Sequence, residues 1–119
     1  MNTFTIELTC THDEWPRFNV RMMGELQNTD GQRTGFASAC GTPDGHCVMN
    51  TGPCHKLRLL VYIIPESLPR QRTVGSNPDF NARLKVSADG RKVCDKTVEV
   101  SRWGGASAEF CISAHGMEE

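Results

Sequence analysis

The sequence predicts an all-β protein, a two-sheet antiparallel β-sandwich of six to eight strands. Apolar residues recur at every second position through most of the chain, which is typical of strands with one buried and one solvated face. No segment carries a capped apolar stripe of helical period, so no helix is expected. Amphipathic strands bury one face each most simply in two packed sheets. Immunoglobulin-like, fibronectin-like and C2-like topologies all stay open.

The first two strands are expected near residues 3–10 and 17–27. Polar residues alternate there with apolar ones, and the predicted inward set is Phe4, Ile6, Leu8 and Cys10, then Phe18, Val20, Met22 and Leu26. Gly24 interrupts the second strand and is expected at a bulge or a bend. The long connection 28–55 is rich in Gly, Pro, Asn and Thr, so it is functional, crosslinked, or hides a strand near residues 34–39.

The segment 56–64 is apolar on both faces and is therefore predicted to be a central strand covered on both sides, with Leu60, Val61, Tyr62 and Ile63 all buried. Asp89-Gly90 supplies the positive φ angles of a tight hairpin. The flanking strands are expected to bury Phe80, Ala82, Leu84 and Val86, then Cys94, Val98 and Val100. A last strand at 107–113 would bury Ala108, Phe110 and Ile112.

Length and charge limit the function classes. A chain of 119 residues fits a single domain spanning residues 1–119. Thirteen Lys and Arg against fourteen Asp and Glu leave a net charge near zero, and the cations form no run apart from the short RQR at 70–72. Neither nucleic acid nor an anionic membrane surface is therefore expected as a partner. The longest apolar run, 59–64, is far shorter than the ~20 residues of a membrane span.

Six cysteines leave three interpretations open. Disulfides are favoured: Cys94 with Cys111, on strands joined by a short connection, and Cys10 with one of Cys40, Cys47 and Cys54. A zinc site would use Cys40, Cys47, Cys54 and His55, although this spacing lacks the close ligand pairs typical of zinc. Free thiols are the third interpretation.

The cysteine content favours an oxidising compartment, whereas the first residues resemble no signal peptide. The chain is therefore expected to be extracytoplasmic or secreted if a signal peptide has been removed from it. A cytoplasmic location is the alternative.

No catalytic motif occurs, and His12 beside Asp13 and Glu14 is more typical of a solvated turn. The sequence favours a non-enzymatic binding module without a cofactor, which presents the 28–55 loop to a protein or, second, to a carbohydrate. The candidate contact residues are Trp15, Trp103, His46 and His55, although each tryptophan could instead cap the core. The alternatives are a metal- or thiol-dependent intracellular protein that uses the Cys40–His55 cluster, and an inhibitor or immunity-type protein that blocks an enzyme.

Overall fold

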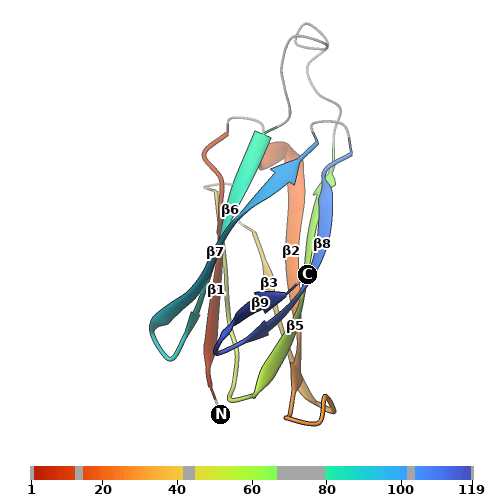
Figure 1. Cartoon of the computed structure of the whole chain (residues 1–119). Helices are drawn as coiled ribbons and strands as arrows, with labels where there is room; N and C mark the ends of the chain where they lie inside the picture. The colour runs from red at the N-terminus through yellow and green to blue at the C-terminus, as the bar shows by residue number, and fades with distance from the viewer. Residues whose placement is uncertain (1, 13–14, 42–44, 67–79, 102–103, 119) are drawn as a thin grey trace, which may run out of the picture.

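The computed structural model describes residues 2–12, 15–41, 45–66, 80–101 and 104–118, and it confirms the all-β sandwich (Figure 1). One antiparallel sheet has four strands in the order β4-β1-β6-β7, and the other has five in the order β3-β2-β5-β8-β9. The elements are β1 (Phe4–Thr9), η1 (Trp15–Arg17), β2 (Phe18–Gln27), β3 (Arg33–Cys40), β4 (His46–Asn50), β5 (Lys56–Pro65), β6 (Phe80–Ala88), β7 (Arg91–Val100), β8 (Ala106–Ser113) and β9 (Gly116–Glu118). No helix among these residues has the length and apolar character that a membrane crossing requires.

The core lies between the two sheets and is built from the inward positions that the alternation predicts. The predicted residues of β1, β2 and β6 are all buried, as are Val98, Val100, Phe110 and Ile112. Cys94 and Ala108 are half-buried and pack against this core. Gly24 occupies a regular inward position rather than a bulge, and Leu57 and Met49 fill the space beside it. The irregularity in β2 lies at Leu26/Gln27 instead.

β5 departs from its prediction. It is the middle strand of its sheet, and Val61 and Ile63 are fully buried. Leu60 and Tyr62, however, are only half-buried, and Ile64 is 51% exposed. The expected cover on the second face is absent from the residues that the structure describes, so the apolar outer residues of β5 face solvent.

The segment 28–55 is not a single loop. It contains β3, at the position where a hidden strand was expected, and β4, which was not predicted. These strands occupy edges of opposite sheets, because β3 pairs with β2 and β4 pairs with β1. The segment 28–55, which was predicted to be one exposed loop, therefore connects the two sheets.

The hairpin at Asp89-Gly90 is confirmed. Both residues have positive φ, 52° and 83°, as a tight two-residue connection between β6 and β7 requires. The Asp89 carboxylate accepts hydrogen bonds from the backbone N–H and the hydroxyl of Thr3, at 2.9 and 3.0 Å. These bonds lower the pKa of Asp89 and tie the hairpin to the start of the chain.

The second expected hairpin is not formed. β7 pairs with β6 in the four-stranded sheet, whereas β8 pairs with β5 in the five-stranded sheet, so the connection between them crosses the sandwich. Ser101 and Gly105 exchange two backbone hydrogen bonds of 2.8 and 2.9 Å within this connection. Gly105 has φ 74°, and a methyl group on it would overlap the carbonyl oxygen of Ile63. The close approach of Gly105 to β5 positions the start of β8.

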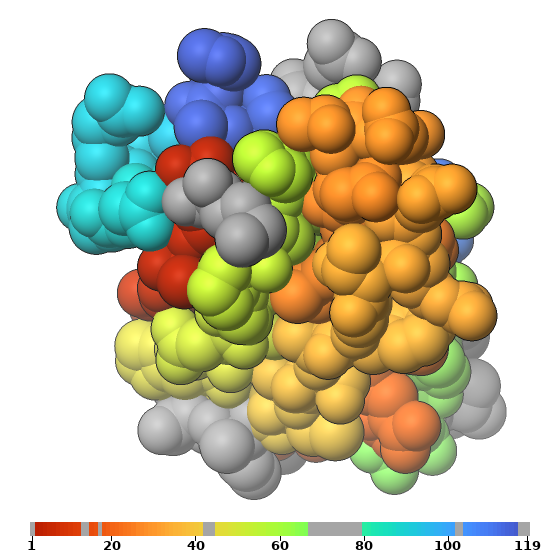
Figure 2. All heavy atoms as spheres, turned by 90° about the horizontal axis from the view of Figure 1, so that it is seen from below, coloured from red at the N-terminus to blue at the C-terminus, as the bar shows by residue number. Residues whose placement is uncertain are grey.

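The opposite end of the sandwich is closed by residues 51–55 (Figure 2). Asn2 and Cys54 form a backbone bridge with two hydrogen bonds of 2.9 Å, and the next residue, His55, donates its backbone N–H to the Gln27 carbonyl at 3.0 Å. Consecutive residues thus bond to opposite sheets and hold them together at this end.

Candidate binding surface

The most unusual surface lies on the solvent side of the five-stranded sheet. Outward residues of a sheet packed on one face are expected to be polar. Here Leu60, Tyr62 and Ile64 follow one another at alternate positions of β5 on that side, and Met23 of β2 lies directly opposite Leu60. Met23 is 46% exposed and Ile64 51%. We call Met23, Leu60, Tyr62 and Ile64 the outer patch.

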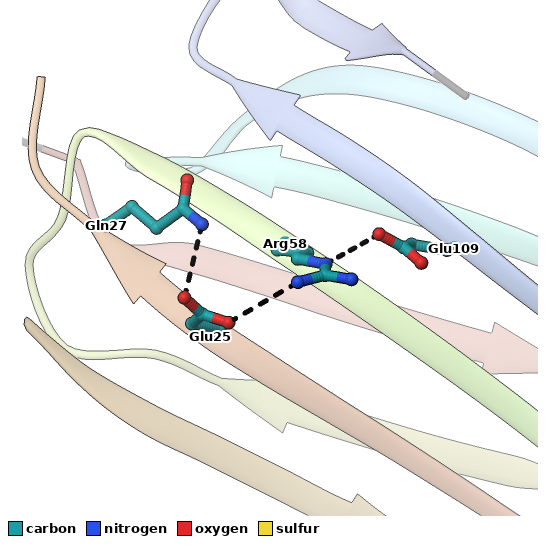
Figure 3. A network of polar contacts seen from close by, with 4 residues as sticks. All are labelled: Glu25, Gln27, Arg58 and Glu109. Atoms are coloured by element: carbon teal, nitrogen blue, oxygen red, sulfur yellow. Dashed lines mark hydrogen bonds and ion pairs between the residues drawn. The ribbon is translucent and has the colours of Figure 1, made fainter. Parts of the chain in front are cut away.

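A charged network borders the outer patch along the same face (Figure 3). Arg58 Nε donates to Glu109 Oε1 at 2.6 Å, and an Arg58 guanidinium nitrogen lies 3.9 Å from Glu25 Oε2. Gln27 Nε2 donates to the other oxygen of Glu25 at 3.4 Å. The network joins three adjacent strands, because Glu25 lies on β2, Arg58 on β5 and Glu109 on β8.

Arg58 is the cation of this network and lies between the carboxylates of Glu25 and Glu109. The hydrogen bond from Arg58 lowers the pKa of Glu109, and the same contact raises the pKa of Arg58. The network itself contains two carboxylates and one guanidinium, and the exposed cations Arg21 and Lys56 lie on the same face, opposite Tyr62 and Gln27. An apolar patch beside an ordered, charged rim is the usual composition of a protein–protein contact surface.

A hollow of about 510 Å³ adjoins this border at the end of the sheet. The exposed thiol of Cys111 and the imidazole of His115 line it, together with Gln27, Lys56 and Ser113. A cysteine nucleophile needs a base within hydrogen-bond reach. No contact between the Cys111 thiol and His115 occurs in the described part of the chain.

The predicted binding residues do not converge. Trp15 is 2% exposed and belongs to the core, as its alternative interpretation as a core cap predicted. Trp103 lies outside the described residues. His46 is exposed opposite Thr9 of β1, whereas His55 is half-buried beside the bridge at the other end of that strand.

The zinc set Cys40, Cys47, Cys54 and His55 is likewise dispersed. Cys47 lies opposite Leu8, and Cys54 lies opposite Asn2. Six residues of strand separate the two positions by about 20 Å at ~3.3 Å per residue, whereas ligands of one zinc ion lie within a few ångströms of each other. No other group of three or more His, Cys, Asp or Glu side chains in the described ranges could hold a metal ion.

All six cysteines are described, and all are free thiols. The expected Cys94–Cys111 bridge is not formed, because Cys111 lies at an exposed outward position of the five-stranded sheet, whereas Cys94 packs against the core from the four-stranded sheet. Cys10, Cys47 and Cys54 are buried, which explains their spacing as core positions of strands and strand ends. Burial raises the pKa of Cys47 to about 11, and charge on nearby Cys40 acts in the same direction. A thiol with so high a pKa is protonated and a poor nucleophile at neutral pH.

Sequence reasoning missed the outer patch because it assigned the outward residues of β5 to a second buried face. The sequence does contain an indication of this patch. A strand that is apolar on both faces either lies between two packed layers or exposes apolar residues to solvent. Met23 carried a second signal, because it interrupts the polar outward series of Arg21 and Glu25 on β2.

No protein-family model and no curated protein sequence matches the chain. Two solved structures share its fold at low sequence identity. A DUF4425 family protein from Bacteroides ovatus is 14% identical with a TM-score of 0.53, and 98% of each chain is covered. A protein from Parabacteroides distasonis, solved in its calcium-bound form, is 9% identical with a TM-score of 0.54, over 94% of this chain and 92% of the other. These similarities concern the fold.

Proposed function

We propose that the chain is a non-enzymatic protein-binding module whose contact surface is the outer patch. The observation that carries the proposal is the continuous row Leu60, Tyr62 and Ile64 beside Met23 on a sheet face that should be polar. Tyr62 supplies an aromatic side chain of the type that anchors protein interfaces. The Glu25–Arg58–Glu109 border supplies a charged rim.

We favour a protein partner over a carbohydrate. The carbohydrate alternative depended on Trp15 and Trp103, and Trp15 is inside the core. A partner that fits the outer patch presents apolar side chains at its centre and polar or charged side chains toward the Glu25–Arg58–Glu109 border. The inhibitor alternative, in which the partner is an enzyme, would use the same surface.

The test compares a patch variant with a matched control. Tyr62→Ala combined with Ile64→Lys removes the aromatic anchor and charges the patch, whereas Val48→Lys changes an apolar residue on the four-stranded sheet whose exposure, 46%, is close to that of Ile64. Immobilised wild-type chain captures the partner from cells that make the protein, and calorimetry then measures the affinity of the purified partner. The double variant should bind at least ~30-fold more weakly, the equivalent of one lost hot spot of ~2 kcal/mol.

The control should bind like the wild type, provided that circular dichroism shows all three proteins folded. Equal affinity of the double variant and the wild type would contradict the outer patch as the contact surface. Turnover of a substrate by the isolated chain would contradict the non-enzymatic assignment.

A further inference from the structure

The four edges of the two sheets are not equally protected against pairing with another strand. Edge strands in soluble proteins are usually short, charged, interrupted by proline or covered, because their unpaired backbone groups recruit other strands. β4 has five residues and β9 three, so both are short. β7 has ten residues, of which five are charged (Arg91, Lys92, Asp95, Lys96 and Glu99).

β3 has none of these protections after its first residue. It is eight residues long, and from Thr34 to Cys40 it contains neither a charge nor a proline. No strand among the described residues pairs with its free side. Its outward ring, Phe36, is 66% exposed, the most exposed large apolar side chain of the described structure.

The register defines which backbone groups are available on this edge. The N–H of Gly41 donates to the Val20 carbonyl at 2.8 Å, in line with the pairing of β3 to β2. Hydrogen-bonded pairs alternate along an antiparallel ladder. Ala39 and Ala37 therefore bond to β2, and the backbone groups of Phe36 and Ser38 point to the free edge.

We infer that β3 pairs antiparallel with β3 of a second copy of this chain, about a two-fold axis at Ala37. This axis places Phe36 of each copy opposite Ser38 of the other, so that their outward backbone groups exchange four hydrogen bonds. A large side chain then meets a small one on both sides of the axis, and the Phe36 ring, over which the Arg33 guanidinium already lies at 4.9 Å, gains a second neighbour. No two like charges oppose each other along residues 34–40, and the net charge of −1 produces little repulsion between copies.

A second copy fits this edge better than an unrelated peptide because residues 36–38 of β3 are complementary to the same residues of another copy. The pair Phe36 and Ser38 is exchanged by the same two-fold axis that makes the hydrogen bonds. The product is a continuous ten-stranded sheet built from two five-stranded ones. This inference does not depend on the proposed function, because the pairing uses the backbone edge of β3, although Ser38 lies opposite Met23 of the outer patch.

Sedimentation of the full chain between about 5 and 500 μM tests the inference, since one short strand pair buries less than a standard interface and should give a micromolar dimer. Ser38→Lys introduces a charge at the centre of the paired edge and should raise the dimer dissociation constant at least tenfold. Ser107→Lys, on the outward face of β8, is the matched control and should dimerise like the wild type.

Amide hydrogen exchange provides a readout that separates this edge from other contacts. Exchange at Phe36 and Ser38 should slow as concentration rises, while Ala37, already bonded to β2, should not change. A monomer throughout the concentration range would overturn the inference. So would a dimer in which Ser38→Lys has no effect, because that dimer would use another surface.

Discussion

Replacing Gly105 by alanine should be one of the most damaging single-methyl additions in this protein. Gly105 has φ 74°, and its Cα approaches the backbone of β5 so closely that a methyl group would overlap the Ile63 carbonyl oxygen and lie 3.0 Å from the carbonyl carbon. A non-glycine residue at such a φ costs about 1–2 kcal/mol. Forcing two strands apart to relieve overpacking costs about 1–3 kcal/mol more.

The free energy of unfolding should therefore fall by about 2–5 kcal/mol, from a total of about 5–15 kcal/mol for a domain of this kind. At ~4 °C per kcal/mol, the melting temperature should drop by about 8–20 °C. Thermal and urea unfolding followed by circular dichroism measure both quantities.

Alanine substitutions at two further glycines distinguish the cost of a positive φ from the cost of the clash with Ile63. Gly90 has a similar φ of 83° but no atom within 4 Å of an added methyl group, so Gly90→Ala should show the strain alone. Gly104 is exposed, and its nearest neighbour would be Ser101 Oγ at 3.8 Å, so Gly104→Ala should be nearly neutral. If Gly105→Ala is no more destabilising than Gly90→Ala, the contact with Ile63 does not position β8.

Three other predictions concern a buried leucine, a buried thiol and a surface carboxylate. Leu59→Ala should cost about 3 kcal/mol in urea unfolding and its neighbour Leu60→Ala at most about 1 kcal/mol, because only Leu59 is fully buried; equal losses would contradict the one-sided cover of β5. The pKa of Cys47 is about 11 when folded and 9.0 ordinarily, so its contribution is complete below pH 9 and is lost as pH rises toward 11. Wild-type stability should thus decline by up to about 2 kcal/mol more than that of Cys47→Ala over this interval, and parallel pH curves would refute the burial of this thiol. The hydrogen bond from Arg83 lowers the pKa of Asp95 to about 2, so the Asp95 contribution is present above pH 3.8 and lost as pH falls through 2. An NMR titration of the carboxyl carbon should find this low pKa, and Arg83→Gln should return it toward 3.8; an unchanged value would show that Arg83 is not its cause.

The fold could be predicted because alternation is a local property. The inward orientation of each core residue of β1 and β6 can be predicted from the apolar residues two positions away. The turn at Asp89-Gly90 can be predicted because these residue types adopt positive φ readily. The pairing of β8 could not be predicted in this way. A short connection usually joins neighbouring strands of one sheet, yet residues 101–105 cross to the other, and only the fit of Gly105 against Ile63 reveals why.

The binding surface could be predicted only in part. The apolar outer residues of β5 are visible in the sequence, but whether another layer covers them is a question of tertiary structure. The cysteines were misleading for a related reason. Cys47 and Cys54 are near in sequence, and the extended path of β4 separates them, so spacing along a strand does not translate into proximity.

The burial of Cys10, Cys47 and Cys54 as free thiols has a kinetic consequence. Folded, these thiols are shielded from oxidants by the core, and no disulfide contributes to stability. Unfolding exposes these three thiols together with half-buried Cys94, beside Cys40 and Cys111, which are exposed already. Six cysteines can pair in fifteen ways, none of which this fold contains. In an oxidising solution each excursion to the unfolded state therefore risks a covalent trap, so that survival is governed by the unfolding rate, whereas a reductant makes the same excursion reversible.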